Sequence, residues 1–152
     1  MTEEEVIAQI EAAFADTPSP GSGFNDISAT QWDEGIVDYF RGKTWQGHRV
    51  QDLLRYSAAL SFFTDKAYRY WLPAFMLAEL AHPEDADIIG DHIAFDFTKS
   101  GFSAARLGQF APNELRAIAA FFDVLAQSCS GELNDGRFRS AACSVRAELE
   151  MT

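Results

Sequence analysis

The chain has 152 residues, the size of one domain, and such a chain can bury a hydrophobic core without disulfides or bound metals. Hydrophobic residues make up 47% of it and thirteen residues are phenylalanine, which excludes a disordered chain. Its 23 acidic and 12 basic residues give a net charge of −11, which repels phosphate backbones and argues against nucleic-acid binding.

The first predicted helix begins at a capping box, in which Thr2 and Glu5 can each bond the backbone N–H of the other residue. Apolar residues recur at helical spacing after it, and we expect the helix to end near Asp16. Residues 17–23, TPSPGSG, predict a loop, since prolines and glycines interrupt regular structure. The helix of residues 1–16 can therefore pack on the domain or on a partner.

Two further helical segments are predicted before residue 64. A capping pattern at Thr30 precedes a short apolar face, and Gly42 can stop that helix. The segment KTWQGHRV then predicts a turn anchored by a buried Trp45. Apolar positions at mixed spacing over residues 50–63 predict a helix that is broken near Ser57.

The most aromatic stretch, YRYWLPAF, lies inside the next predicted helix. Thr64 and Asp65 favour a helix start, and the composition stays helical as far as His82. Pro73 has no N–H, and its ring clashes with the carbonyl four residues earlier. We therefore expect two short helices that meet at Pro73, with one kinked helix as the alternative.

The second half of the chain contains one weakly patterned region and two predicted helices. Residues 83–110 are the least regular, and although HIAFDF alternates as a strand does, a single strand has nothing to pair with. We interpret this region as irregular or helical. A clear helix starts with Pro112 at its first position and Glu114 in its first turn, and a last helix follows Asn134.

Together these elements predict an all-α fold. The expected architecture is a compact, single-domain helical bundle of about five to seven helices over residues 1–152, with a helix break at Pro73. No apolar run approaches the roughly 18–20 residues that span a bilayer. Acids stand where a secretory signal would have Lys or Arg, so we expect a soluble, cytoplasmic protein of bacterial type.

Two elements of the middle region resemble an uncharacterised family of small bacterial proteins. RGKTW carries a G-K-x-W pattern, and ALSFFTDKAYRYWLPAF fits A-L-x-F-[LF]-[TS]-x-x-A-x-R-Y-[YW]-L-P-A-[FY]. The matching residues are Gly42, Lys43, Trp45, Ala59, Leu60, Phe62, Phe63, Thr64, Ala67, Arg69, Tyr70, Trp71, Leu72, Pro73, Ala74 and Phe75. A later helix starts Ala111-Pro112-Asn113-Glu114, without the threonine of the family's T-P-E-like start. The resemblance covers about half of the chain and implies a shared fold without an assigned activity.

Aromatic residues and an arginine are the candidate partner-binding residues, because such side chains dominate interface energetics. They are Trp32, Tyr39, Trp45, Tyr68 and Arg69. All of them can instead belong to the core. For Arg69 we favour a structural role, in which its stem lies along aromatic surface, over a role in anion binding.

The densest polar stretch, HPEDADIIGDHIAFD, supplies the candidate metal ligands. They are His82, Asp85, Asp87, Asp91 and His92, within a cluster that ends at Asp96. Imidazole with carboxylate suits transition metals, yet the EF-hand and HExxH spacings are absent, and a solvated turn between helices is the commoner explanation. Cys129 and Cys143 form no CxxC pair, so we expect free thiols, and no cofactor is implied.

The acidic residues are concentrated towards the N-terminal end. Residues 1–50 hold nine acids and three bases, whereas residues 101–152 hold six and five. This distribution favours a non-enzymatic protein-interaction module that binds a basic partner. A small metal-dependent enzyme or ligand-binding protein that uses the His82–Asp96 cluster is the alternative, a homodimer is a third possibility, and no reaction is identified.

Overall fold

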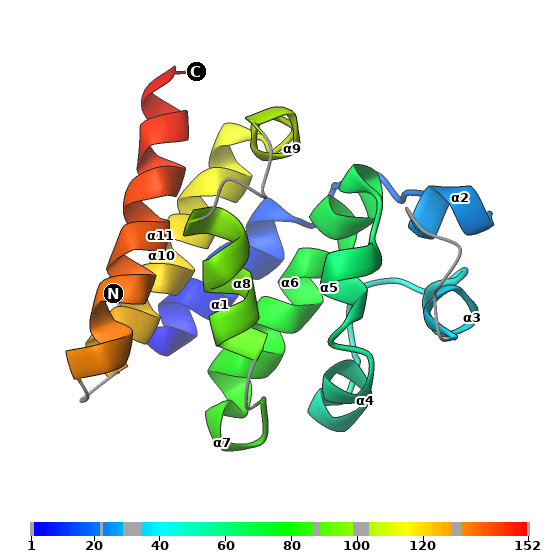
Figure 1. Ribbon diagram of the computed structural model, residues 1–152, viewed down its shortest axis with the longest axis horizontal. Helices are drawn as coiled ribbons and strands as arrows, with labels where there is room; N and C mark the ends of the chain where they lie inside the picture. Colours follow the sequence, from blue (N-terminus) through cyan, green and yellow to red (C-terminus); the bar gives the residue numbers. More distant parts are fainter. Residues whose placement is uncertain are drawn as a thin grey trace. The chain divides into compact units, whose positions relative to one another are not determined.

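The computed structural model describes residues 2–21, 23–28, 35–86, 89–98, 104–128 and 132–151 (Figure 1). The described residues form helices and no strand, apart from one isolated bridge between Ser28 and Phe63, so the predicted all-α class is confirmed. Five of these helices have ten residues or more, in agreement with the predicted five to seven. The long helices are α1 (Glu3–Ala13), α6 (Asp65–Ala81), α8 (Ile89–Thr98), α10 (Pro112–Ser128) and α11 (Glu132–Met151).

The remaining helices are short. They are α2 (Phe24–Ile27), α3 (Ile36–Phe40), α4 (Val50–Arg55), α5 (Ala59–Phe62), α7 (Pro83–Ala86) and α9 (Ala104–Gly108). The chain divides into two compact units, the first made of Met1–Ala15 with Gly90–Thr152 and the second of Asp16–Ile89. The single domain predicted for residues 1–152 stays a prediction.

In the first unit, α10 packs against both α1 and α11 (Figure 1). Its buried face is continuous because apolar residues recur every three or four positions. The buried residues of α10 include Leu115, Ala117, Ile118, Phe121 and Phe122. Phe97 of α8 adds an edge-on ring contact, with its centroid 5.6 Å from that of Phe122.

The capping box of α1 is present as predicted. The backbone N–H of Glu5 donates to Thr2 Oγ1 at 3.2 Å, and the Thr2 N–H donates to Glu5 Oε1 at 3.1 Å. The hydrogen bond from the Thr2 backbone lowers the pKa of Glu5. Val6 and Ile10 are fully buried below this turn, so local capping and burial fix α1 together.

The start of α10 has half of a capping box. Glu114 Oε1 accepts a 2.7 Å hydrogen bond from the backbone N–H of Ala111, while Ala111 has no hydroxyl to return it. The Glu114 side chain is buried. The amide of Asn113 donates to the carbonyl of Ala13 at 3.3 Å, which ties the end of α1 to the start of α10.

In the second unit, α6 is the central helix and packs against α2, α4 and α7. Its start is capped as predicted, because Thr64 Oγ1 accepts from the Ala67 N–H at 3.1 Å. The same hydroxyl donates to the carbonyl of Asp26 at 2.7 Å. Thr64 therefore starts α6 and also fixes α2 beside it.

Pro73 lies inside α6, which runs without a break from Asp65 to Ala81. The predicted break into two short helices at Pro73 is wrong, and a single helix is observed. A proline in a helix interior costs about 3 kcal/mol. Twelve of the seventeen residues of α6 are buried, and each large apolar side chain contributes about 1.5–3 kcal/mol on burial. Burial of the intact helix therefore outweighs the cost of the proline.

The remaining predicted boundaries agree with the structure to different degrees. The break near Ser57 is confirmed, since it lies between α4 and α5. The described parts of residues 83–110 form helices α7, α8 and α9 with a turn at residues 109–110, so the helical interpretation holds and no strand forms among these described residues. Thr30, where a helix is predicted to start, lies outside the described residues, and the described part of that segment contains α3, which starts after Gly35 in the left-handed conformation at φ 87°. None of the described helices combines the length and hydropathy needed to cross a bilayer.

Candidate functional site

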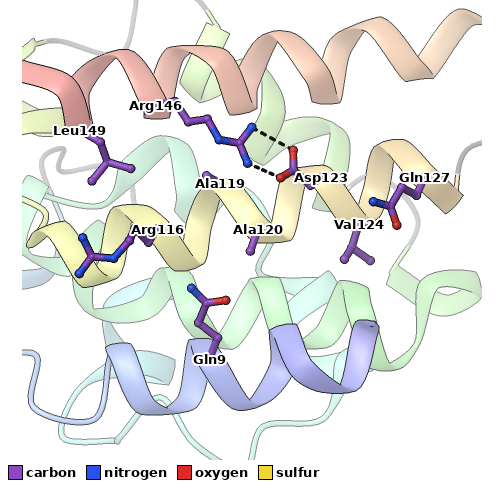
Figure 2. Close-up of a pocket in the computed structure, with 9 residues that line it drawn as sticks. All are labelled: Gln9, Arg116, Ala119, Ala120, Asp123, Val124, Gln127, Arg146 and Leu149. Carbon is purple, nitrogen blue, oxygen red and sulfur yellow. Dashed lines mark hydrogen bonds and ion pairs between the residues drawn. The ribbon is translucent and has the colours of Figure 1, made fainter. Parts of the chain in front are cut away.

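A groove of about 260 Å³ lies in the first unit, where α10 forms the floor and α1 and α11 form the walls (Figure 2). It is lined by Gln9, Arg116, Ala119, Ala120, Asp123, Val124, Gln127, Arg146 and Leu149. The groove exists because small side chains, Ala119 and Ala120, stand at the middle of the floor. Their size leaves room between the helices that longer side chains would fill.

The groove is closed along α11 by an ion pair between Arg146 and Asp123 (Figure 2). Arg146 Nη1 donates to Asp123 Oδ1 at 3.1 Å, and Nη2 donates to the other carboxylate oxygen. The hydrogen bond that Arg146 donates to Asp123 raises the pKa of Arg146. Because both side chains are partly exposed, the pair contributes only about 0–1 kcal/mol of stability. Its main effect is to hold both charged groups in fixed orientations.

The wall formed by α1 contains a polar atom without a partner. Gln9 Oε1 is buried, and no described residue donates a hydrogen bond to it. Figure 2 shows the Gln9 side chain reaching from α1 towards α10. An unsatisfied buried acceptor costs about 1–3 kcal/mol. Because this oxygen is also shielded from solvent, it stays unpaired inside the wall that α1 forms.

The charge of the groove is opposite in sign to that of the whole protein. Two arginines and one aspartate line it, a balance of +1 within a chain of −11. Arg116 stands at one end of the floor, and no hydrogen bond or ion pair joins it to another described residue. The charge of this lining suits a small anion.

The outer surface of α1 has the opposite charge. The chain has no Lys or Arg before Arg41, and its first 40 residues contain nine acids. Glu3, Glu4, Glu5 and Glu11 are all exposed. The three glutamates in the first turn interact favourably with the positive end of the helix dipole, which accounts for part of the acidic pattern of α1. Glu4 and Glu11 lie two turns apart on one side of α1, opposite its buried residues.

The predicted partner-binding residues are not gathered on one surface. Trp45 is 3% exposed and Tyr68 is fully buried, so neither can be a surface anchor in this structure. Their rings fill the core around α6, which is the alternative the sequence left open. Arg69 is half-buried on α6. Trp32 lies outside the described residues.

Tyr39 is half-buried and forms a hydrogen-bonded pair with His48. His48 Nε2 lies 2.6 Å from the carbonyl of Thr44, so Nε2 carries the proton and donates. In the neutral ring, Nδ1 then accepts from the Tyr39 hydroxyl at 2.8 Å. Both nitrogens of His48 are therefore occupied by structural bonds, so this histidine is not available as a free base.

Tyr39→Phe is expected to lower the free energy of unfolding by about 1 kcal/mol at neutral pH, since it removes one hydrogen bond. Burial raises the pKa of the Tyr39 hydroxyl above its ordinary value of 10.0. The unfolded state therefore ionises first, so this part of the stability is complete below pH 10.0 and is lost as pH rises through the folded pKa. Urea unfolding at neutral and alkaline pH measures both effects. Equal stability of the two proteins at neutral pH would contradict the assignment.

Among the described residues, the predicted metal ligands either form ion pairs with other side chains or lie apart from one another. Asp91 Oδ1 lies 2.6 Å from Arg137 Nη1, and His92 Nε2 lies 3.8 Å from Asp96 Oδ2. His82 is exposed at the end of α6. Asp87 and the side chain of Asp85 lie outside the described part of the chain. No group of three or more metal-ligating side chains occurs among the described residues, so the metal site stays a prediction without structural support.

The groove was missed by sequence reasoning, although one signal for it is present. Arg116, Ala120, Asp123 and Gln127 recur at spacings of four, three and four along α10, so they share one helix face. A helix face of this composition is typical of an ordinary solvated surface. The contribution of Gln9 from α1 has no counterpart in any local pattern, because α1 and α10 are about one hundred residues apart.

Comparison with curated proteins and with solved structures gave no match. The model of a family of unknown function, DUF6714, matches residues 2–142. The resemblance to an uncharacterised family is thereby confirmed, and the match extends well beyond the middle region in which it was recognised. The chain belongs to the family of unknown function DUF6714.

Proposed function

We propose that this protein is a non-enzymatic interaction module that binds a basic protein through the exposed acidic side of α1. The observation that carries the proposal is the run of exposed glutamates on α1 in a chain segment that has no Lys or Arg before Arg41. A field of one sign steers an oppositely charged partner and makes association sensitive to salt.

The arrangement within α1 supports this proposal. Val6 and Ile10 hold the helix against the first unit, so Glu4 and Glu11 stay on a rigid support and point away from it. A rigid helix face costs a partner less entropy on binding than a mobile tail would. A cytoplasmic location in a bacterial cell, and the absence of nucleic-acid binding, belong to the same proposal and rest on the negative charge.

The test is affinity capture of partners from native lysate with wild-type and variant baits. The variant combines Glu4→Gln and Glu11→Gln and leaves the capping residue Glu5 unchanged. Two exposed ion pairs contribute about 0.2–1 kcal/mol each, so the affinity for the captured partner is expected to fall by about two- to thirty-fold. The purified partner should carry a net positive charge and dissociate at high salt.

The matched control combines Glu84→Gln and Glu150→Gln, two exposed glutamates on α7 and α11. This control removes the same number of negative charges from other helices, and the variant bait should still capture the partner. The proposal is rejected if no basic protein is captured at low salt, or if both double variants lose the partner equally. Capture of a second copy of this chain would favour the homodimer instead.

A further inference from the structure

We propose that a basic surface of the second unit binds a short acidic segment of another protein, through carboxylates and one apolar side chain of that segment. The surface consists of the stacked rings of Tyr39 and Tyr56 and the cations around them, Lys43, Arg49 and Arg55. This inference goes beyond the proposed function, because it concerns a different surface and a partner of the opposite charge.

The first element of the site is a local excess of positive charge. Residues 39–51 contain Arg41, Lys43 and Arg49 and no acid, although the whole chain has a net charge of −11. All three side chains are exposed. Arg49 is paired with Asp52, whose Oδ2 lies 3.2 Å from the arginine Nε. Lys43 is bonded to a backbone carbonyl, which is neutral and leaves the charge of the ammonium unbalanced.

The second element is the way two cations are held against the rings. Tyr39 and Tyr56 are half-buried and stack with their centroids 4.6 Å apart. Lys43 Nζ lies 4.6 Å from the centroid of the Tyr39 ring. Arg55 Cζ lies 5.5 Å from the centroid of the Tyr56 ring. A ring contact orients a cation without neutralising it. Among the described residues neither cation forms an ion pair, so both remain available to carboxylates.

The third element is a small cavity of about 150 Å³ next to the rings. It is lined by Ile36, Arg55, Tyr56 and Ala58. Because Arg55 and Tyr56 belong to both, the cavity adjoins the basic surface. Ile36 and Ala58 give the cavity apolar walls, which suit an aliphatic side chain, while Arg55 suits a carboxylate beside it. A leucine flanked by glutamates meets both requirements.

A protein segment fits this surface better than a nucleic acid does. Proteins that bind DNA neutralise on the order of 6–10 phosphates, whereas Lys43 and Arg55 are the cations of this surface without a carboxylate partner in the described structure. An extended polyanion would also reach the acidic residues that dominate the rest of the chain. A short segment needs few charged contacts, and it supplies the aliphatic side chain that a phosphate backbone lacks.

Three short capped peptides separate the requirements. The first is a run of glutamates with one central leucine, the second has glutamines in place of the glutamates, and the third has serine in place of the leucine. Binding is followed on the full chain by NMR shifts of backbone amides at about 0.15 M salt, where charges more than about 8 Å away are largely screened. We expect the first peptide to shift amides of residues 36–58. The other two should bind about tenfold more weakly, because each lacks one kind of contact.

Charge variants assign the contacts of the glutamates. Arg55→Gln should weaken the first peptide about two- to fivefold, and its combination with Lys43→Gln up to about thirtyfold, as expected for exposed ion pairs. The matched control combines Lys66→Gln and Arg139→Gln, two exposed cations on α6 and α11, and should leave the affinity within about twofold of wild type. Arg55→Gln alone keeps the backbone bond of Lys43, so it tests the surface even if the double variant disturbs the end of α3.

A cavity variant assigns the contact of the leucine. Ala58 is exposed and lines the cavity, so Ala58→Leu fills the cavity from its open side. This variant should weaken the leucine peptide about tenfold and leave the affinity for the serine peptide unchanged. Ala147→Leu, at an exposed alanine of α11, is the matched control and should change neither affinity.

The inference is overturned if the first peptide shifts no amides at about 10 mM, a concentration at which even millimolar affinities approach saturation. It is also overturned if the glutamine peptide binds as well as the first, if the two double charge variants have equal effects, or if Ala58→Leu and Ala147→Leu do. Tighter binding of single-stranded DNA or of phosphatidylserine vesicles to this surface would assign it to another class of partner. These outcomes are independent of the proposed function, since the variants leave the glutamates of α1 unchanged.

Discussion

Replacing Trp71 by alanine is expected to lower the free energy of unfolding by about 3–5 kcal/mol, the usual cost of removing a large buried aromatic side chain. Trp71 is 1% exposed at the centre of the second unit. The ring of Phe40 lies edge-on to it at 4.6 Å, and that of His48 at 5.1 Å. Truncation would leave a cavity that these rigid rings cannot fill without moving the short helix α3 or the loop after it.

Trp71→Phe is the matched variant for this position. It keeps an aromatic ring in the cluster and should cost clearly less than the alanine variant, because most of the packing remains. Urea unfolding followed by circular dichroism gives both values. A loss below about 1 kcal/mol for Trp71→Ala, typical of surface substitutions, would show that the cluster around α6 is not a packed core.

Phe122→Ala is expected to have a similar effect in the first unit, with a loss of about 3–5 kcal/mol. Phe122 is fully buried on α10. Its ring centroid lies 5.3 Å from that of Phe121 and 5.6 Å from that of Phe97. The matched control is Phe95→Ala on α8, where the same side chain is 55% exposed. That variant should change stability by no more than about 0.5 kcal/mol.

The Phe122 variant also tests whether the two units unfold together. All three tryptophans, Trp32, Trp45 and Trp71, lie in the second unit, so tryptophan fluorescence reports that unit alone, while far-ultraviolet circular dichroism reports helices of both. The predicted single domain requires that Phe122→Ala shift both signals to the same midpoint. A fluorescence midpoint that stays at the wild-type value would show two independently unfolding units.

Gln9 belongs to the same helix as Glu4 and Glu11 but faces α10. The acidic side of α1, which we propose as the partner surface, therefore lies away from the groove.

The sequence by itself determined the fold class and most helix starts. The caps at Thr2 and Thr64 were predictable because each bonds a backbone N–H three residues away, so the whole signal lies within one helical turn. The break near Ser57 and the start at Pro112 are also set by neighbouring residues. Local hydrogen bonds and helical periodicity depend only on residues within one short stretch of the sequence.

Only the tertiary structure decided what happens at Pro73 and which side chains reach the surface. Pro73 locally favours a helix break, but the burial of α6 stabilises the intact helix by more than the proline costs. That burial depends on helices far away in the sequence. The same dependence buries Trp45 and Tyr68, and it brings Gln9 of α1 beside α10 to form the groove. Burial is a property of contacts between distant segments, so no local pattern in this chain could specify it.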